Sequence, residues 1–167
     1  MGRYGSPGRV RCDEFLHSII VDPTDFELGP DQLKFLFLSH AEKGGMSVLR
    51  DAAGDNEFQI TIRMRVEKKP GRSFYGIASF KCQVVRALVA SPNALGRAEG
   101  DRLYFVLDTD EPGRPHHADI FVTVPRADAG ATKKQAWRKQ RADLMALMND
   151  GFVPANEFRG GRLVQVA

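Results

Sequence analysis

Two apolar runs near the middle of the chain have the clearest strand pattern, and turn-forming residues separate them. Leu103–Leu107 is apolar at every position, which is typical of a strand covered on both faces. In Ala118–Val124 the alternate residues Ala, Ile, Val and Val form one face that is predicted to join the core, and the other face continues the side of His117 and Asp119. The connecting loop of about eight residues is longer than the roughly two to five usual in a hairpin. We therefore predict an antiparallel hairpin whose loop is a place to look for function.

A second strand pattern covers Phe58–Glu67, where apolar residues occupy every other position. The positions between them are mostly polar, including Arg63 and Arg65. This alternation predicts an amphipathic strand with one face in water, as in an antiparallel sheet. After a turn over Lys68–Arg72, the run Phe74–Ala78 is predicted to pair back onto it.

Other apolar segments leave the type of element open. The run ending at Val21, before Asp22-Pro23, is too short for its periodicity to separate helix from strand. Pro30 is suited to the first turn of a helix, but the apolar residues that follow do not decide the type. Met46–Arg50 is a short strand or a loop, and Ser79 is expected to cap a short helix over Phe80–Val89.

A longer helix is predicted near the C-terminus. Thr132–Gln135 has the form of a capping box, and Gly151 follows the expected end at about Met148 or Asn149. These segments together predict an α+β fold, in which a largely antiparallel sheet has this amphipathic helix packed across it. Residues 1–11 are predicted to be a flexible basic arm, and residues 12–167 a single α+β domain.

Composition indicates a soluble globular protein, with 43% hydrophobic and 27% charged residues. No apolar run approaches the roughly 20 residues that span a bilayer, so no membrane partner is expected. The first residues are basic but lack the apolar run of a signal peptide, so a cytoplasmic location is expected. Cys12 and Cys82 are too few for a disulfide framework, and no cofactor is predicted.

Positive charge is concentrated in the first half of the C-terminal helix, although the net charge is only +3. Cations near a helix N-terminus oppose the macrodipole, which suggests that they hold phosphate or an acidic partner. A merely solvated face is the alternative. Arg63 and Arg65, with Lys68, Lys69 and Arg72 of the following turn, form a second basic strip. The candidate partner-binding residues of the helix are Lys133, Lys134, Arg138, Lys139 and Arg141.

Side chains that could take part in catalysis or metal binding are concentrated around the central hairpin. Asp108, His117 and Asp119, joined by a distal His17 or His40, have the residue types of a facial triad for a divalent metal. Alternatively, His117 is an acid–base group near neutral pH, with Asp108 or Asp119 orienting it. A third interpretation is that His117 only satisfies backbone groups at the end of the hairpin.

Two further positions enter the enzymatic hypothesis. Arg50 is predicted to anchor a phosphate or carboxylate of the ligand. Ser47 follows Gly44-Gly45, and bare backbone amides of that kind can cradle an anion, although a plain turn is the simpler interpretation. No motif supports a nucleophilic role for Ser47 or Cys82. The candidate catalytic set is therefore His117, Arg50, Ser47 and Asp108.

Three segments carry a resemblance to a family. GGMSVLR (44–50), GIASFKCQVVRAL (76–88) and DTDEPGRPHHADI (108–120), followed by the basic helix, resemble an uncharacterised group of small bacterial proteins. That group has a GLSVDR-like stretch, a Gly-Val-Ala-Ser-like stretch and a Pro-x-His-Ala step before a Lys/Arg-rich helix. Leu49 stands here where the group has an acidic residue. The resemblance points to Ser47, Arg50 and His117 and implies no activity.

Two functions are therefore expected. The first is a binding or accessory module of a bacterial cytosolic complex, which recognises nucleic acid or an acidic protein surface through its basic residues. The alternative is an enzyme acting on a phosphate-bearing ligand, with His117 as the acid–base group and Arg50 as the anchor.

Overall fold

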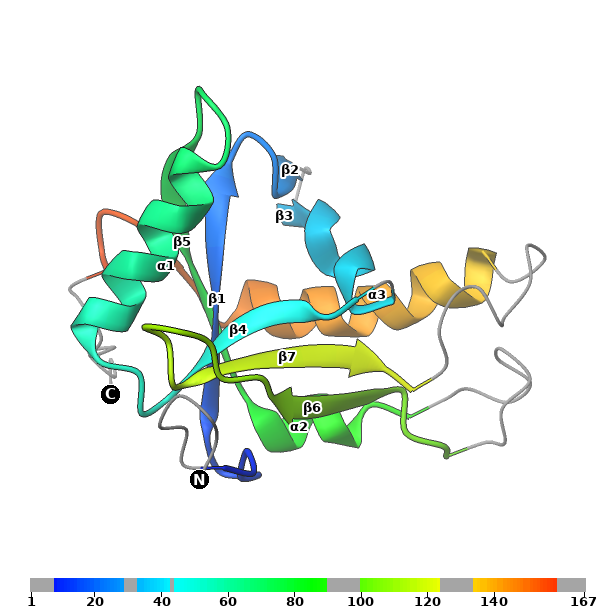
Figure 1. The fold of residues 1–167 in the computed structure, drawn as a ribbon. Coiled ribbons are helices and arrows are strands. Elements are labelled where there is room, and N and C mark those ends of the chain that lie inside the picture. The colour runs from blue at the N-terminus through cyan, green and yellow to red at the C-terminus, as the bar shows by residue number, and fades with distance from the viewer. Residues whose placement is uncertain (1–7, 29–32, 43, 90–99, 124–133, 159–167) are drawn as a thin grey trace.

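A computed structural model describes residues 8–28, 33–42, 44–89, 100–123 and 134–158, and it has the expected α+β architecture (Figure 1). The strands are β1 (Phe15–Asp22), β2 (Phe26–Leu28), β3 (Leu33–Phe35), β4 (Met46–Arg50), β5 (Ser73–Lys81), β6 (Tyr104–Asp108), β7 (His117–Val122) and β8 (Phe152–Pro154). The helices are the 3₁₀ helix η1 (Leu36–Glu42), α1 (Asp55–Glu67), α2 (Cys82–Ala87) and α3 (Lys134–Asp150). Six strands form one sheet in the order β6-β7-β4-β1-β5-β8, and all its neighbouring strands are antiparallel.

The predicted central hairpin is confirmed. β6 and β7 pair from Tyr104↔Val122 to Asp108↔Ala118. The predicted core face of β7 is buried, with Ala118 and Ile120 fully inaccessible, whereas Val124 lies outside the described residues. On the opposite face of β7, the side chain of His117 is also buried, at 2% exposed.

The prediction of a strand over 58–67 is wrong, because this segment belongs to the helix α1. Its alternating apolar residues include Phe58, Ile62 and Val66, which recur every fourth position and therefore also lie on one side of a helix. These three pack in the same buried cluster, whereas Met64 is 53% exposed. The helix begins after Gly54, and acidic residues in its first turn suit the positive end of the helix dipole.

The partner predicted for Phe74–Ala78 is therefore wrong too. This run lies within β5, which pairs along its length with β1 and not with residues 58–67. The apolar run before Asp22-Pro23, whose type was open, is the strand β1. The short helix predicted from Phe80 begins two residues later as α2, because Phe80 and Lys81 still belong to the β1–β5 ladder.

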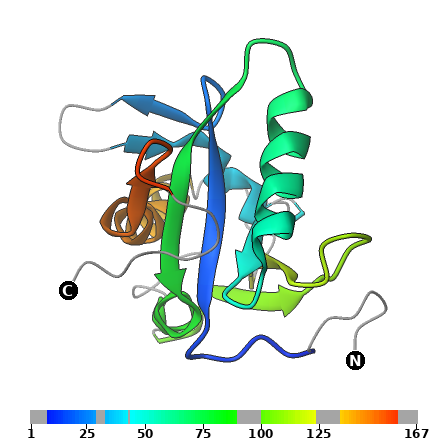
Figure 2. The same cartoon turned by 90° about the vertical axis from the view of Figure 1, so that its left-hand side faces the viewer.

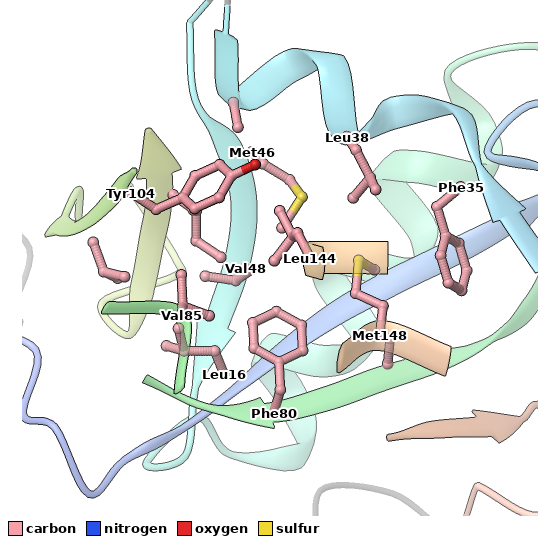
Figure 3. Close-up of a cluster of buried hydrophobic side chains, with 14 of the residues drawn as sticks. Leu16, Phe35, Leu38, Met46, Val48, Phe80, Val85, Tyr104, Leu144 and Met148 are labelled. Atoms are coloured by element: carbon pink, nitrogen blue, oxygen red, sulfur yellow. The ribbon is translucent and has the colours of Figure 1, made fainter. Parts of the chain in front are cut away.

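Both faces of the sheet carry buried clusters. The larger cluster lies on the side of Met46 and Val48, and Figure 3 shows side chains of β1, β4, β5, η1 and α3 pointing toward one another in it. The smaller cluster contains Ile19, Leu49 and Ile77 beneath α1. Figure 2 shows α1 on one side of β1 and β5, and α3 on the other.

The C-terminal helix α3 ends at Asp150, one residue beyond the predicted Asn149, with Gly151 next along the chain as expected. Leu144 and Met148 are fully buried in the larger cluster, and the contacts of α3 include β3, η1 and β5. That it lies across the whole sheet stays a prediction. Thr132 lies outside the described residues, and so does the side chain of Trp137.

The predicted arm, residues 1–11, is described from Gly8 onward. There the carbonyl groups of Gly8 and Arg9 accept hydrogen bonds from Arg50, and Val10 is 1% exposed. Packing therefore begins before the boundary predicted at residue 12, because one apolar side chain among the arginines joins the larger cluster.

Candidate active site

A serine and a histidine from neighbouring strands meet on the face of the sheet that carries α1. Ser47 Oγ lies 2.6 Å from His117 Nε2. The register of β4 and β7 explains the contact, because Ser47 pairs with Asp119 and Leu49 pairs with His117. Residues two apart along a strand share a face, so all four side chains point the same way.

The hydrogen bonds of the imidazole assign its tautomer. Nδ1 of His117 lies 3.1 Å from the carbonyl oxygen of Thr109 and 3.0 Å from the hydroxyl of the same residue. A carbonyl oxygen only accepts, so Nδ1 carries the proton and Nε2 accepts the hydrogen bond of the Ser47 hydroxyl. The Thr109 hydroxyl in turn donates to Asp119 Oδ2 at 2.8 Å. The result is a continuous chain from Asp119 through Thr109 and His117 to Ser47.

The imidazole is held in its neutral form. Burial lowers the pKa of His117 below its ordinary value of 6.5, and the charge of Arg114 lowers it further, whereas the charge of Asp119 opposes both. A neutral imidazole with an accepting Nε2 can take a proton from a hydroxyl, which is the requirement for a general base.

Ser47, His117 and Asp119 line a cavity of about 430 Å³. Helix α1 and the turn after it contribute Arg65, Lys68 and Arg72, and the loop between β6 and β7 contributes Glu111 and Arg114. Asp25 also lines it and accepts from Arg65 at 2.6 Å, while Glu111 accepts from Arg114. With Asp119 included, three carboxyl groups face four Lys or Arg side chains along the wall, which favours an anionic ligand.

One hydrogen-bonded pair joins α1 to the hairpin. Both carboxylate oxygens of Glu57 contact His116: Oε1 is 2.6 Å from Nδ1, and Oε2 accepts from the backbone N–H at 3.0 Å. Glu57 is 8% exposed, so this contact is largely shielded from water. The contact holds the helix that carries Arg65 beside the strand that carries His117.

The prediction that Arg50 anchors a ligand beside His117 is wrong. The side chain of Arg50 is on the same face of β4 as that of Val48, which is the face of the sheet opposite to His117. Arg50 is 2% exposed. It donates to both oxygens of Glu14 at 2.8 Å and to Asp108 Oδ1 at 3.2 Å. A guanidinium enclosed by these partners supports the packing of the N-terminal segment and is not presented to the cavity.

The role predicted for Asp108 changes with that of Arg50. Its carboxylate bonds Arg50, whereas Asp119 is hydrogen-bonded to Thr109, which contacts Nδ1 of His117, so Asp119 is the carboxylate that orients the imidazole. The facial triad with His17 is not assembled: His17 Nδ1 lies 2.9 Å from Ser79 Oγ, and both nitrogens of His117 are already engaged. Within the described ranges, no group of three or more His, Cys, Asp or Glu side chains is placed to hold a metal ion.

The candidate partner-binding residues are only partly described. Arg63 is exposed on α1, whereas Arg65 is half-buried and bonded to Asp25. They lie on a helix and not on the wet face of a strand. Arg141 is half-buried in α3. Lys133 lies outside the described residues, as do the side chains of Lys134, Arg138 and Lys139.

Sequence reasoning missed Thr109 and Arg114. Thr109 has no motif around it, and its role depends on the end of β6 lying beside His117. Arg114 was visible only as one of the loop residues between two strands. Its burial, at 7% exposed, is a property of the folded loop.

The chain matches no known protein-family model, and comparisons with curated proteins and with solved structures find no significant match. In the part of the chain that the structure describes, no helix is both long and apolar enough to cross a membrane.

Proposed function

We propose that the protein is an enzyme that uses Ser47 as a nucleophile and His117 as its general base, on a small substrate with an anionic group. The observation that carries the proposal is the 2.6 Å contact between Ser47 Oγ and the accepting nitrogen of His117. A nucleophile in contact with a base, whose other nitrogen is held by a third group, is the arrangement that activates a serine hydroxyl.

Each group has a defined part in this reaction. His117 takes the hydroxyl proton as Ser47 attacks, and then gives it to the leaving group. Thr109 and Asp119 keep the proton on Nδ1 and offset the positive charge that forms on the ring. The cations of the cavity, Lys68 and Arg114 among them, attract the anionic group of the substrate.

The first experiment is covalent labelling with phenylmethanesulfonyl fluoride, followed by peptide mass spectrometry. Ser47 is expected to be labelled in the wild-type protein, and labelling is expected to fall at least about a hundredfold in His117→Gln, which is the lower range for loss of a general base. Ser47→Ala should abolish the modification of that peptide.

Ser79 supplies a matched control, because it forms the second serine–histidine contact of the sheet, with His17, but does not line the cavity. Ser79→Ala should leave the labelling of Ser47 unchanged. Absence of label on Ser47 in folded wild-type protein, or equal labelling of the His117→Gln variant, would refute the proposal.

Recognition of nucleic acid or an acidic protein surface, within a bacterial cytoplasmic complex, stays a second and separate prediction. Its support is the charge of the sequence around Lys134 and Arg138. Its test is the salt dependence of binding, described in the Discussion.

A further inference from the structure

We infer that the group that reacts at Ser47 is a phosphate monoester, bound by Arg72 and Arg114, and that Ser47 is transiently phosphorylated. This inference rests on the proposed function, since it needs Ser47 as the nucleophile. It adds the chemical class of the substrate and the residues that recognise it.

Two guanidinium groups on the cavity wall have unused donors. Nε of Arg72 and Nε of Arg114 are both buried, and within the described residues neither has a hydrogen-bond partner. The side chain of Arg114 is only 8% exposed, and its Nη2 donates to Glu111. A buried cation with an unmade hydrogen bond is destabilising. Both side chains also line the cavity, so the negative charge of an anion bound there would offset that cost, although it would not reach the buried Nε atoms themselves.

Within the described residues, the unpaired positive charges on the cavity wall also favour an anionic ligand. Arg65 and Arg114 each have a carboxylate partner, whereas Lys68 and Arg72 form no ion pair with any described residue. Burial lowers the pKa of Arg114, which is the expected effect when a guanidinium is desolvated without full compensation. A phosphate dianion supplies the missing negative charge, and its oxygens suit the planar donor geometry of guanidinium groups.

The backbone near Ser47 favours phosphoryl transfer over acyl transfer. Acyl transfer concentrates charge on one oxyanion, which enzymes commonly stabilise with backbone N–H groups. The amides of Gly44 and Gly45 precede the strand of Ser47, but both donate to the carbonyl of His40 at 3.0 Å. Phosphoryl transfer spreads charge over three equatorial oxygens, which the side-chain cations of this cavity can contact.

The reaction balances without an oxidant or reductant. Ser47 Oγ forms a bond to phosphorus as the ester P–O bond breaks, and the serine proton passes through His117 Nε2 to the departing alkoxide. Water then attacks phosphorus and gives a proton to His117. The Oγ–P bond breaks, the proton returns to Ser47, and inorganic phosphate leaves.

The test compares p-nitrophenyl phosphate with p-nitrophenyl acetate, using the full chain. The phosphate ester is expected to be hydrolysed, with a phosphoryl group found on Ser47 after acid quench. Inorganic phosphate is expected to protect Ser47 from phenylmethanesulfonyl fluoride. The concentration that gives half protection should rise about tenfold or more in Arg72→Gln, since a charge-assisted hydrogen bond is worth at least about 1.5 kcal/mol.

Arg63→Gln is the matched control, because Arg63 is exposed on the same helix region and does not line the cavity. It should leave phosphate protection unchanged. Arg114→Gln should behave like Arg72→Gln, and if it fails to fold, Arg72→Gln and Lys68→Gln still decide the test.

The outcomes separate the two proposals. Labelling of Ser47 with hydrolysis of the acetate only, and without protection by phosphate, would overturn the phosphate inference and leave the nucleophile in place. Protection that is equal in wild type, Arg72→Gln and Lys68→Gln would also overturn it. Loss of all labelling at Ser47 would instead refute the proposed function.

Discussion

His17 makes the stability of the protein depend on pH. It is 5% exposed beneath α1, with Nδ1 against Ser79 Oγ and the ring of Phe58 at a centroid distance of 5.5 Å. Burial lowers the pKa of His17 from 6.5 to about 4, against the opposing charge of Asp51, whose Oδ1 is 3.9 Å from Nε2. The folded state therefore disfavours the protonated ring.

The sign and size of the effect follow from proton linkage. At pH 7 the ring is neutral in both the folded and the unfolded chain, so there is no penalty. Below pH 6.5 the unfolded chain binds a proton that the folded chain does not bind until about pH 4, so stability falls as the pH falls. Each pH unit in this window costs about 1.4 kcal/mol, so the loss at pH 5 is about 2 kcal/mol.

The perturbation that isolates this effect is His17→Asn, which retains a polar partner for Ser79 but does not titrate. Free energies of unfolding are measured by urea titration at pH 7 and pH 5. The wild-type protein should lose about 2 kcal/mol more than the variant between the two pH values. Gln59→Asn, at an exposed position of α1, is the control, because neither side chain titrates, and it should lose as much as wild type.

The comparison of the two losses removes the contribution of every other titrating group, including His117. Equal losses in wild type and His17→Asn would refute the reasoning, because they would show that burial does not depress the pKa of this ring.

Three further perturbations test the fold and the second function. Arg50→Leu is expected to lower the free energy of unfolding by about 3 to 5 kcal/mol in urea titrations, because it leaves two largely buried carboxylates without their cation. Gly151→Ala is expected to cost about 1 to 3 kcal/mol by thermal melting, because its Cβ would overlap the backbone carbonyl of Ser79. If the basic helix binds nucleic acid, replacing Lys134 and Arg138 with Gln should flatten the log–log salt dependence of affinity by about one unit per lost phosphate contact.

Each of these three predictions has a control variant or a result that would contradict it. Arg63→Leu, at an exposed arginine, should change stability by no more than about 0.5 kcal/mol, and a similar effect from both arginines would argue against the buried network. Gly44→Ala has nothing within 4 Å of its Cβ and should be tolerated, unlike Gly151→Ala. An unchanged salt slope would place the charges of the helix outside any interface.

The local pattern of apolar and turn residues was enough to predict part of the fold. The hairpin of β6 and β7 and the end of α3 before Gly151 follow from apolar periodicity and turn residues. Phe58–Glu67 shows the limit of this approach, because all five of its apolar positions fit a period of two, while Phe58, Ile62 and Val66 also fit a period near four. The helix was decided by the packing of Phe58 against the sheet, which is a tertiary effect.

The candidate site shows a different limit. Ser47 and His117 were both singled out, but they are 70 positions apart, and only the pairing of β4 with β7 brings them into contact. The same ladder separates Arg50 from His117, since neighbouring residues on a strand face opposite ways. Thr109 carries no signal of its own, because a threonine at a strand end is common and its role here is positional.

The strand register that aligns Ser47 with Asp119 limits how the length of this chain can vary among relatives. A single inserted or deleted residue within β4 or β7 would turn Ser47 or His117 toward the opposite face and abolish their contact, even if the sheet still formed. Changes of length between Asp110 and Arg114 fall outside both strands and leave that alignment intact. In relatives of this chain, retention of the serine and the histidine should therefore track the spacing within these two strands and tolerate variation in the loop that precedes the histidine.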